Sequence, residues 1–163
     1  MPQRWPVAPM RRAIAERQGG RMHGEHVDGV VIRPLRNGEF ETVQAVFDGL
    51  GDRSRLLRFG GAKNVLRGED LAVLARVDAT HHVLVAVARG VPVGLARLVR
   101  DGATAEVAFE VVDEWQGRGV GRLLVDRLAA DARAAGIAAL VGEVRDANPA
   151  SRALLRRARL AVA

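Results

Sequence analysis

The stretch Ala105–Ala135, AEVAFEVVDEWQGRGVGRLLVDRLAADARAA, holds three patterns in direct succession. Residues 105–112 are mostly apolar and β-branched, which predicts a strand. A glycine-rich turn, QGRGVG, follows at 116–121. Apolar residues then recur every four positions, at Val120, Leu124, Leu128 and Ala132. This spacing predicts an amphipathic helix, so the stretch is expected to run from a strand through a glycine-rich turn into a helix.

A turn of this kind is a natural binding site for an anion. The first backbone N–H groups of a helix have no partner within the helix, and the helix dipole adds partial positive charge there. Glycines let the backbone approach a ligand because they carry no Cβ atom. Arg118 and Arg122 add full positive charges beside the turn. A phosphate or pyrophosphate group is therefore the expected ligand.

Three glycine-loop patterns compete for this turn. A P-loop needs Lys and Ser or Thr after its last glycine, and neither follows Gly121. A dinucleotide fingerprint needs G-x-G-x-x-G, whereas the spacing here is G-x-G-x-G. The pattern Gln/Arg-x-x-Gly-x-Gly/Ala fits Gln116, Gly119 and Gly121, and it resembles the pyrophosphate loop of the GNAT superfamily of acyl-CoA-dependent N-acetyltransferases. The alternative is a tight strand–helix turn that uses its glycines for geometry alone.

Composition narrows the class of protein. A chain of 163 residues with 48% hydrophobic and 27% charged residues predicts one globular domain. The absence of Cys excludes disulfides, thiolate metal sites and a cysteine nucleophile. No secretory signal or apolar run of membrane-spanning length is visible, so we expect a cytoplasmic protein without a membrane partner.

The net charge of +6 comes almost entirely from arginine, since Lys63 is the only lysine. Such a charge can indicate nucleic-acid binding, but it also fits the codon bias of a GC-rich genome. The arginines are scattered over several elements, and with 4% aromatic residues and no Tyr the chain lacks a stacking platform. We therefore expect no nucleic-acid partner.

The remaining sequence predicts a flexible N-terminal arm at 1–29 and a domain at 30–163. Two helical turns are conceivable at 11–18, and His23 and His26 lack a second pair of ligands, so no metal is expected. Strands are predicted at 30–35, 82–88, 91–99 and 139–144, the middle two as an antiparallel hairpin, with the start of another at 160–163. Helices are predicted at 38–50, 52–59, 69–77 and 148–159.

This order predicts an α/β sheet of mixed direction. It is also the order of the GNAT fold, a mixed, mostly antiparallel sheet flanked by helices, and the resemblance spans residues 30–160. The segments IRPL, SRLLRF, HHVLVAV, AEVAFEV and WQGRGVG look most like the branch that acetylates lysines of metabolic enzymes. In that branch the domain is often fused to regulatory or synthetase-like domains. The C-terminal hairpin of the fold is shortened here, and an open sheet edge would invite a homodimer.

The chemistry of such a family requires a base for the amine. We assign it to Glu106, because similar enzymes carry a catalytic glutamate on the same strand at nearly this spacing before the loop. Glu110 is the second candidate and shares the face of Glu106 in a regular strand, unless a bulge intervenes. The structural alternative for either residue is pairing with an arginine on a neighbouring strand, such as Arg97.

The resemblance implies acetyl-CoA as cosubstrate and an amine acceptor, either a protein lysine or a small molecule. Without Cys, direct transfer in a ternary complex is expected. Backbone groups of Val111 and Val112 would pair with the pantetheine arm. Asn148 matches a family position near the thiol. The pyrophosphate would be held by the turn and its neighbouring arginine: Gln116, Gly117, Arg118, Gly119, Val120, Gly121 and Arg122.

The chain departs from the family at the expected proton donor for the leaving thiolate. The usual Tyr on the last helix is replaced by Leu155. Ser151 or water could take its place. This departure leaves open a second hypothesis, a CoA-binding module of the same fold without catalysis.

Overall fold

The computed structural model describes residues 5, 27, 29–61, 63–142, 149–157 and 161–162. They form one six-stranded sheet with the strands in chain order. The strands are β1 (Val30–Pro34), β2 (His81–Ala88), β3 (Val91–Asp101), β4 (Thr104–Val111), β5 (Ala139–Gly142) and β6 (Ala161–Val162). Strands β1 to β4 pair antiparallel, whereas β4–β5 and β5–β6 are parallel. The predicted mixed, mostly antiparallel sheet is confirmed.

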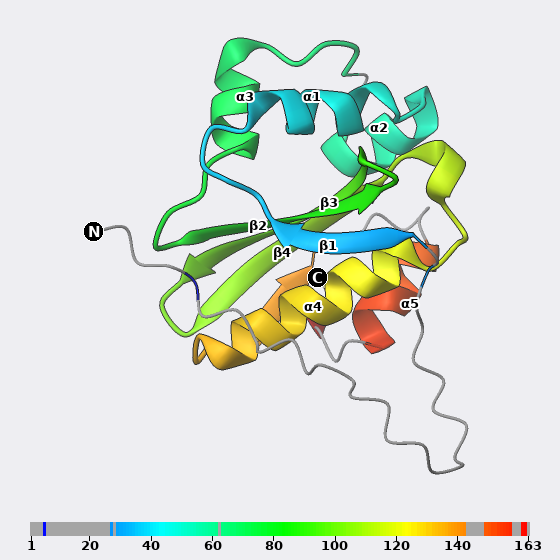
Figure 1. Ribbon diagram of the computed structural model, residues 1–163. Helices are drawn as coiled ribbons and strands as arrows, with labels where there is room; N and C mark the ends of the chain where they lie inside the picture. The colour runs from blue at the N-terminus through cyan, green and yellow to red at the C-terminus, as the bar shows by residue number, and fades with distance from the viewer. Residues whose placement is uncertain are drawn as a thin grey trace, which may run out of the picture.

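Helices cover both faces of this sheet (Figure 1). The helices are α1 (Phe40–Asp48), α2 (Asp52–Phe59), α3 (Gly68–Leu74), α4 (Val120–Ala134) and α5 (Pro149–Arg157), with a 3-10 turn, η1, at Asp113–Trp115. Helices α1 to α3 lie over one face, and α4 and α5 lie over the other. Because both faces are covered, β2 is buried continuously from His82 to Ala86 instead of alternating with solvent.

The hairpin between β2 and β3 follows the prediction. Its two turn residues, Arg89 and Gly90, have φ angles of 50° and 81°. Two consecutive positive φ angles are the mark of the tight turn whose twist matches antiparallel strands. One irregularity in the pairing register lies between Ala86 and Val87.

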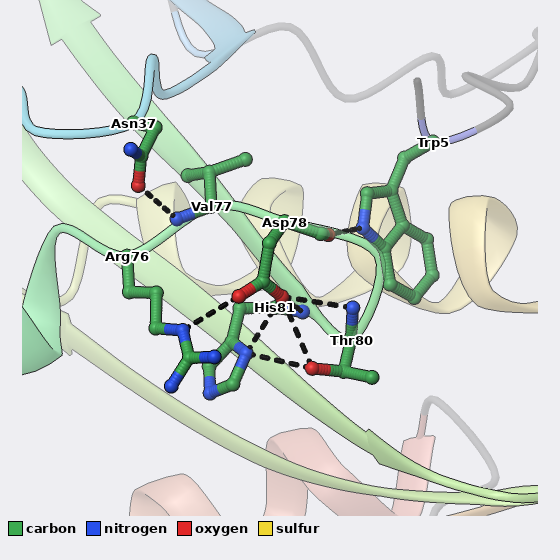
Figure 2. A network of polar contacts seen from close by, with 7 residues as sticks. All are labelled: Trp5, Asn37, Arg76, Val77, Asp78, Thr80 and His81. Carbon is green, nitrogen blue, oxygen red and sulfur yellow. Dashed lines mark hydrogen bonds and ion pairs between the residues drawn. The ribbon is translucent and has the colours of Figure 1, made fainter. Parts of the chain in front are cut away.

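Helix α3 is shorter than the predicted segment 69–77. It ends at Leu74, and Ala75 caps it. The N–H of Val77 donates instead to Oδ1 of Asn37 at 2.9 Å, so a side chain from the α1 entry loop replaces the helical acceptor (Figure 2). The expectations at 11–18, 143–144 and 158–160 lie outside the described residues.

A buried polar pair joins β2 to the last turns of α4. Nε2 of His82 lies 2.8 Å from Oδ2 of Asp131, and the two side chains are 2% and 0% exposed. Nε of Arg127 donates to the other carboxylate oxygen of Asp131 at 3.1 Å. Trp5, from within the predicted arm, stacks on the His82 ring with centroids 5.0 Å apart. Its Nε1–H donates to the carbonyl of Asp78 at 2.8 Å (Figure 2).

Asp78 is the centre of the turn that precedes β2. Its carboxylate accepts hydrogen bonds from the N–H groups of Thr80 and His81, both at 2.9 Å, and from Nε of Arg76 at 2.6 Å (Figure 2). Burial of Asp78 raises its pKa, but the hydrogen bonds to its carboxylate lower the pKa by more, so the pKa lies well below its ordinary value. The carboxylate is therefore ionised when it holds this turn together.

Candidate functional site

A cavity of about 660 Å³ opens between the two helical layers at one edge of β4. Its walls are α2, residues 106–111 of β4, the glycine-rich turn with the start of α4, and α5. The segments that the sequence singled out, the strand with two glutamates and the loop after it, therefore meet in one cleft.

The cleft exists because β4 and β5 separate. The two strands pair only from Thr104–Ala139 to Val107–Gly142 within the described part of the chain. Beyond Val107, β4 pairs with β3 on one side. Backbone groups of successive residues point to opposite sides of a strand. Since the N–H of Val112 bonds to the carbonyl of Val93 at 2.9 Å, the backbone groups of Val111 face the opened side.

The two residues predicted to pair with a pantetheine arm differ in how their backbone groups are used. Val111 lines the cleft, and its carbonyl accepts Nε2 of Gln116 at 2.9 Å. Val112 is 7% exposed, its N–H is bonded to β3, and its carbonyl accepts the N–H of Trp115 at 2.9 Å. The backbone of Val112 is therefore turned into the fold, whereas the N–H of Val111, which has no acceptor among the described residues, is available to an extended ligand.

The glycine-rich turn presents backbone donors to the cleft. Gly117 and Gly119 have φ angles of 72° and 88°, a conformation that other residues adopt at a cost, and Gly119 is the N-cap of α4. Leu123 is the first residue of α4 whose N–H reaches back, to the carbonyl of Gly119 at 3.1 Å. No acceptor within the described residues bonds to the N–H groups of Val120 or Gly121. This turn can bind an anion without any rearrangement of the helix.

Gly121 lies where three elements converge. A Cβ atom there would stand 3.1 Å from Cδ1 of Leu154 and 3.7 Å from ring and methyl atoms of Phe109 and Val111. The glycine thus lets α4 approach both α5 and β4 at the head of the cleft. A side chain at this position would press on Leu154 of α5.

The other residues predicted to bind the pyrophosphate differ in placement. Gly117, Val120 and Arg122 line the cleft, and Nε of Arg122 lies 3.9 Å from Oδ2 of Asp126. Arg118 does not line it, because its guanidinium lies over the Trp115 ring, 4.9 Å from the centroid. Asn148 lies outside the described residues.

Gln116 forms hydrogen bonds with other residues of the protein through its backbone and its side chain. Its N–H bonds to the carbonyl of Asp113 at 3.2 Å, so this donor is not open to a phosphate. Its side-chain Nε2 donates to the carbonyl of Val111 at 2.9 Å and to Oγ of Ser54 at 3.0 Å. Gln116 lines the cleft and bridges β4 and α2, and its role in binding the pyrophosphate stays a prediction.

Both candidate glutamates line the cleft on the face of β4 that looks toward α2. The pairing of β3 with β4 runs without a register shift, so no bulge separates them. Glu110 is 9% exposed and its Oε2 accepts from Nε of Arg58 at 2.7 Å. Glu106 is exposed, and no described residue forms a hydrogen bond or ion pair with it.

Arg97 does not act as the ion-pair partner that the sequence suggested. It lies opposite Ala108, between the two glutamates, without a hydrogen bond to either. Burial lowers the pKa of Arg97, the charge of Arg58 adds to this effect, and the charges of Glu110 and Glu106 oppose it. Arg58, on α2, is the true partner of Glu110, and the linear sequence holds no signal for this contact.

The α5 wall explains the departure at position 155. Leu155 is 1% exposed and packs against β5 so closely that Gly142 has no room for a Cβ atom. Ser151 is half-buried and lines the cleft.

Among the described residues, no group of three or more His, Asp or Glu side chains could hold a metal ion. No helix in the described ranges is long and apolar enough to cross a membrane.

Comparison with known proteins agrees with this geometry. The acetyltransferase Pat of Mycolicibacterium smegmatis is 37% identical over 93 residues, which are 53% of this chain and 28% of that protein. The chain thus matches little more than a quarter of that relative's length. The crystal structure of the GNAT domain of S. lividans PAT superposes with a TM-score of 0.73 at 30% identity, covering 78% of each chain.

A more distant structure supports the fold alone. The putative acetyltransferase yncA of Salmonella typhimurium, solved with its cofactor acetyl-CoA, has a TM-score of 0.62 at 24% identity and covers 80% of this chain and 78% of its own.

The model of the acetyltransferase (GNAT) family matches residues 56–159, from α2 through α5. This chain therefore belongs to the acetyltransferase (GNAT) family.

Proposed function

We propose that this protein is an acetyl-CoA-dependent N-acetyltransferase that acetylates a primary amine, on a protein lysine or a small molecule, by direct transfer in a ternary complex. The observation that carries the proposal is the pair of N–H groups at Val120 and Gly121, which have no acceptor among the described residues and belong to residues that line the same cleft as Glu106. An anion site and a carboxylate base in one cleft are what acyl transfer from coenzyme A to an amine needs.

The residues of the cleft divide the work of binding. The first turn of α4 would hold the pyrophosphate through its N–H groups, assisted by the helix dipole. The backbone of Val111 would pair with the extended arm as an added strand would. Acetyl-CoA, when bound, supplies an activated acyl thioester.

Glu106 would accept the proton of the attacking amine, directly or through a water molecule. Its exposed carboxylate has no protein partner in the described part of the chain, so it is free to take that proton. Glu110 is less suited to this role, because its ion pair with Arg58 would have to be broken first. With Leu155 buried where the family has Tyr, a proton for the leaving thiolate would come from water or from Ser151.

The test is calorimetric titration of acetyl-CoA into the wild type and Gly121→Asp, with Gly121→Asn to separate shape from charge. We expect micromolar binding to the wild type and at least about a 100-fold loss in Gly121→Asp, since a carboxylate would replace the anion. The matched control is Gly68→Asp, in the first turn of α3, where an added Cβ meets nothing within 4 Å. No binding to the wild type would overturn the proposal.

The second hypothesis, a CoA-binding module without catalysis, is favoured by one observation, the buried Leu155 in place of a proton donor. It predicts the same calorimetry but no acetylation of any amine by the wild type. A screen of small amines and lysine peptides with mass-spectrometric detection separates the two hypotheses.

A further inference from the structure

Helix α2 forms one wall of the cleft but has little packing of its own. None of its eight residues is buried, although Ser54, Leu57 and Arg58 line the cleft. Its contacts with α1 include the stacking of Arg55 on Phe47, 4.1 Å from the ring centroid, a hydrogen bond from Nη2 of Arg55 to the carbonyl of Phe47 at 3.1 Å, and the ring contact of Phe47 with Phe59 at 5.8 Å. A short helix without a buried face depends on its other contacts for a fixed position.

Those other contacts are polar, and they tie α2 to β4 and to the start of the glycine-rich turn. Oγ of Ser54 donates to Oδ1 of Asp113 at 2.6 Å. Nε2 of Gln116 donates to Oγ of Ser54 at 3.0 Å and lies 3.2 Å from the same Asp113 oxygen. At the other end of α2, Arg58 is bound to Glu110. We call Ser54, Asp113 and Gln116 the Ser54 latch.

The backbone before α2 is fitted against the same residues. The N–H of Asp113 donates to the carbonyl of Gly49 at 3.0 Å. A Cβ on Gly51, the N-cap of α2, would collide with the Asp113 carboxylate. The carboxylate thus sits at the N-terminus of α2, where the helix dipole favours a negative charge. The latch is therefore in contact with α2 through both backbone and side chains.

The latch also reaches the edge where a cofactor arm would run. The same Gln116 amide that bonds Ser54 donates to the carbonyl of Val111 at 2.9 Å. Val111 is the cleft-facing residue at the opened edge of β4. One side chain therefore joins the predicted cofactor-binding edge to the helix on the opposite wall.

We propose that the Ser54 latch couples cofactor binding to the position of α2, and that Gln116 and Ser54 are positioning residues. A ligand held along Val111 and the first turn of α4 fixes Gln116, Gln116 fixes Ser54, and α2 is held as the wall against which the amine is placed. This inference rests on the proposed function. By reciprocity of linked equilibria, a better ordered α2 in turn strengthens cofactor binding.

The experiment is hydrogen–deuterium exchange of the α2 amides in the full chain, with and without coenzyme A. The variant is Ser54→Ala. The matched control is Thr80→Ala, which removes a hydroxyl that also donates to an aspartate, Asp78, at 3.0 Å, in the turn before β2. Without ligand, we expect α2 to exchange about fivefold faster in Ser54→Ala than in the wild type or Thr80→Ala.

Coenzyme A should then slow α2 exchange about fivefold in the wild type and Thr80→Ala, but less than twofold in Ser54→Ala. Ser54→Thr, which keeps the hydroxyl, should restore the wild-type response. Adding Gln116→Leu to Ser54→Ala should not reduce the response of α2 to coenzyme A any further, because Ser54→Ala has already broken the bond that joins Gln116 to α2. A ligand response in Ser54→Ala equal to that of the wild type would overturn the coupling.

The outcomes separate this inference from the proposed function. If the wild type fails to bind acetyl-CoA by calorimetry, the proposed function falls and the coupling falls with it. If it binds and Ser54→Ala behaves as the wild type does, only the latch is rejected. A purely structural latch would raise α2 exchange without ligand yet leave the response to coenzyme A intact, and that result also rejects the coupling.

Discussion

The two ends of α4 differ in whether their terminal backbone groups form hydrogen bonds within the protein. At the N-terminal end, the N–H groups of Val120 and Gly121 have no acceptor in the described part of the chain and open onto the cleft. At the C-terminal end, the carbonyls of Ala132 and Arg133 accept the N–H groups of Ile137 and Gly136, both at 3.0 Å. Helix α4 thus begins at a site left open for a ligand and ends in a closed hydrogen-bond network.

The side chains follow the same division. At the closed end, Asp131 is fully buried and binds His82 and Arg127, while Trp5 covers the His82 ring. In the cleft, Glu106 lies farther along β4, in the sheet row of Val99 and His81, and its carboxylate has no protein partner among the described residues. We infer that stability is concentrated in the buried pair at the closed end and chemistry in the cleft, an arrangement in which substitutions should separate the two properties.

The largest expected effect is on chemistry in the cleft. Glu106→Gln should lower kcat about 100- to 10,000-fold, because the carboxylate that takes the amine proton is lost. The unfolding free energy and the affinity for acetyl-CoA should be nearly unchanged, since the Glu106 carboxylate makes no hydrogen bond or ion pair with a described residue. Steady-state kinetics and urea unfolding measure the two. Glu110→Gln is the comparison, and a larger loss of kcat there than in Glu106→Gln would move the base to Glu110.

The next effect is on stability at the closed end. Asp131→Ala should lower the unfolding free energy by about 3–5 kcal/mol, because it leaves His82 and Arg127 without their buried carboxylate. Asp126→Ala, on the same helix with 54% of its side chain exposed, should change it by less than about 0.5 kcal/mol. Urea unfolding followed by circular dichroism gives both values. Equal effects of the two substitutions would contradict the contrast between the ends.

Trp5 provides an intermediate test of the same end. Trp5→Ala should lower the unfolding free energy by about 2 kcal/mol, since a half-buried indole and its hydrogen bond to Asp78 are both lost. Trp5→Phe keeps a ring over His82 and should recover about half of that. Thermal and urea unfolding of the full chain measure the series. An unchanged stability in Trp5→Ala would show that residue 5 is not part of the closed network in solution.

The smallest effect is a pH dependence from Asp78. Its folded pKa lies below its ordinary value of 3.8, so its contribution is complete above about pH 4 and is lost as the pH falls toward the folded pKa. The stability difference between the wild type and Asp78→Asn should therefore shrink below pH 4. We place this effect last because the side chain is 35% exposed and solvent screens it. A difference that grows on acidification would contradict the sign.

Local patterns predicted the elements and the glycine-rich turn well. Helix α2 lies at Asp52–Phe59 as expected, and the turn at Arg89-Gly90 has the expected backbone, because periodicity and turn residues act over a few positions. The ends of α3 were wrong because Asn37, 40 residues away in sequence, takes the N–H of Val77. Element boundaries depend on such tertiary contacts.

The site was predicted less completely, for the same reason. The two glutamates and the glycine-rich turn lie within one segment of the sequence, so their patterns were visible there. Their hydrogen-bond partners lie far away in the sequence, so those contacts could not be predicted. Arg58 reaches Glu110 across 52 positions, and Ser54 reaches Gln116 across 62. Gln116 was given a ligand's role because its motif was visible, while its acceptors were not.

The indole side chains of this protein offer a consequence for spectroscopy. The chain has no Tyr and two Trp, so its near-ultraviolet emission comes from those two rings. Trp5 stacks on an imidazole at the closed end, whereas Trp115 lines the cleft beneath the Arg118 guanidinium. Each end of α4 thus carries its own intrinsic fluorophore. Trp5→Phe would leave a protein whose emission follows ligands entering the cleft, and Trp115→Phe one whose emission follows the packing of Trp5 on His82.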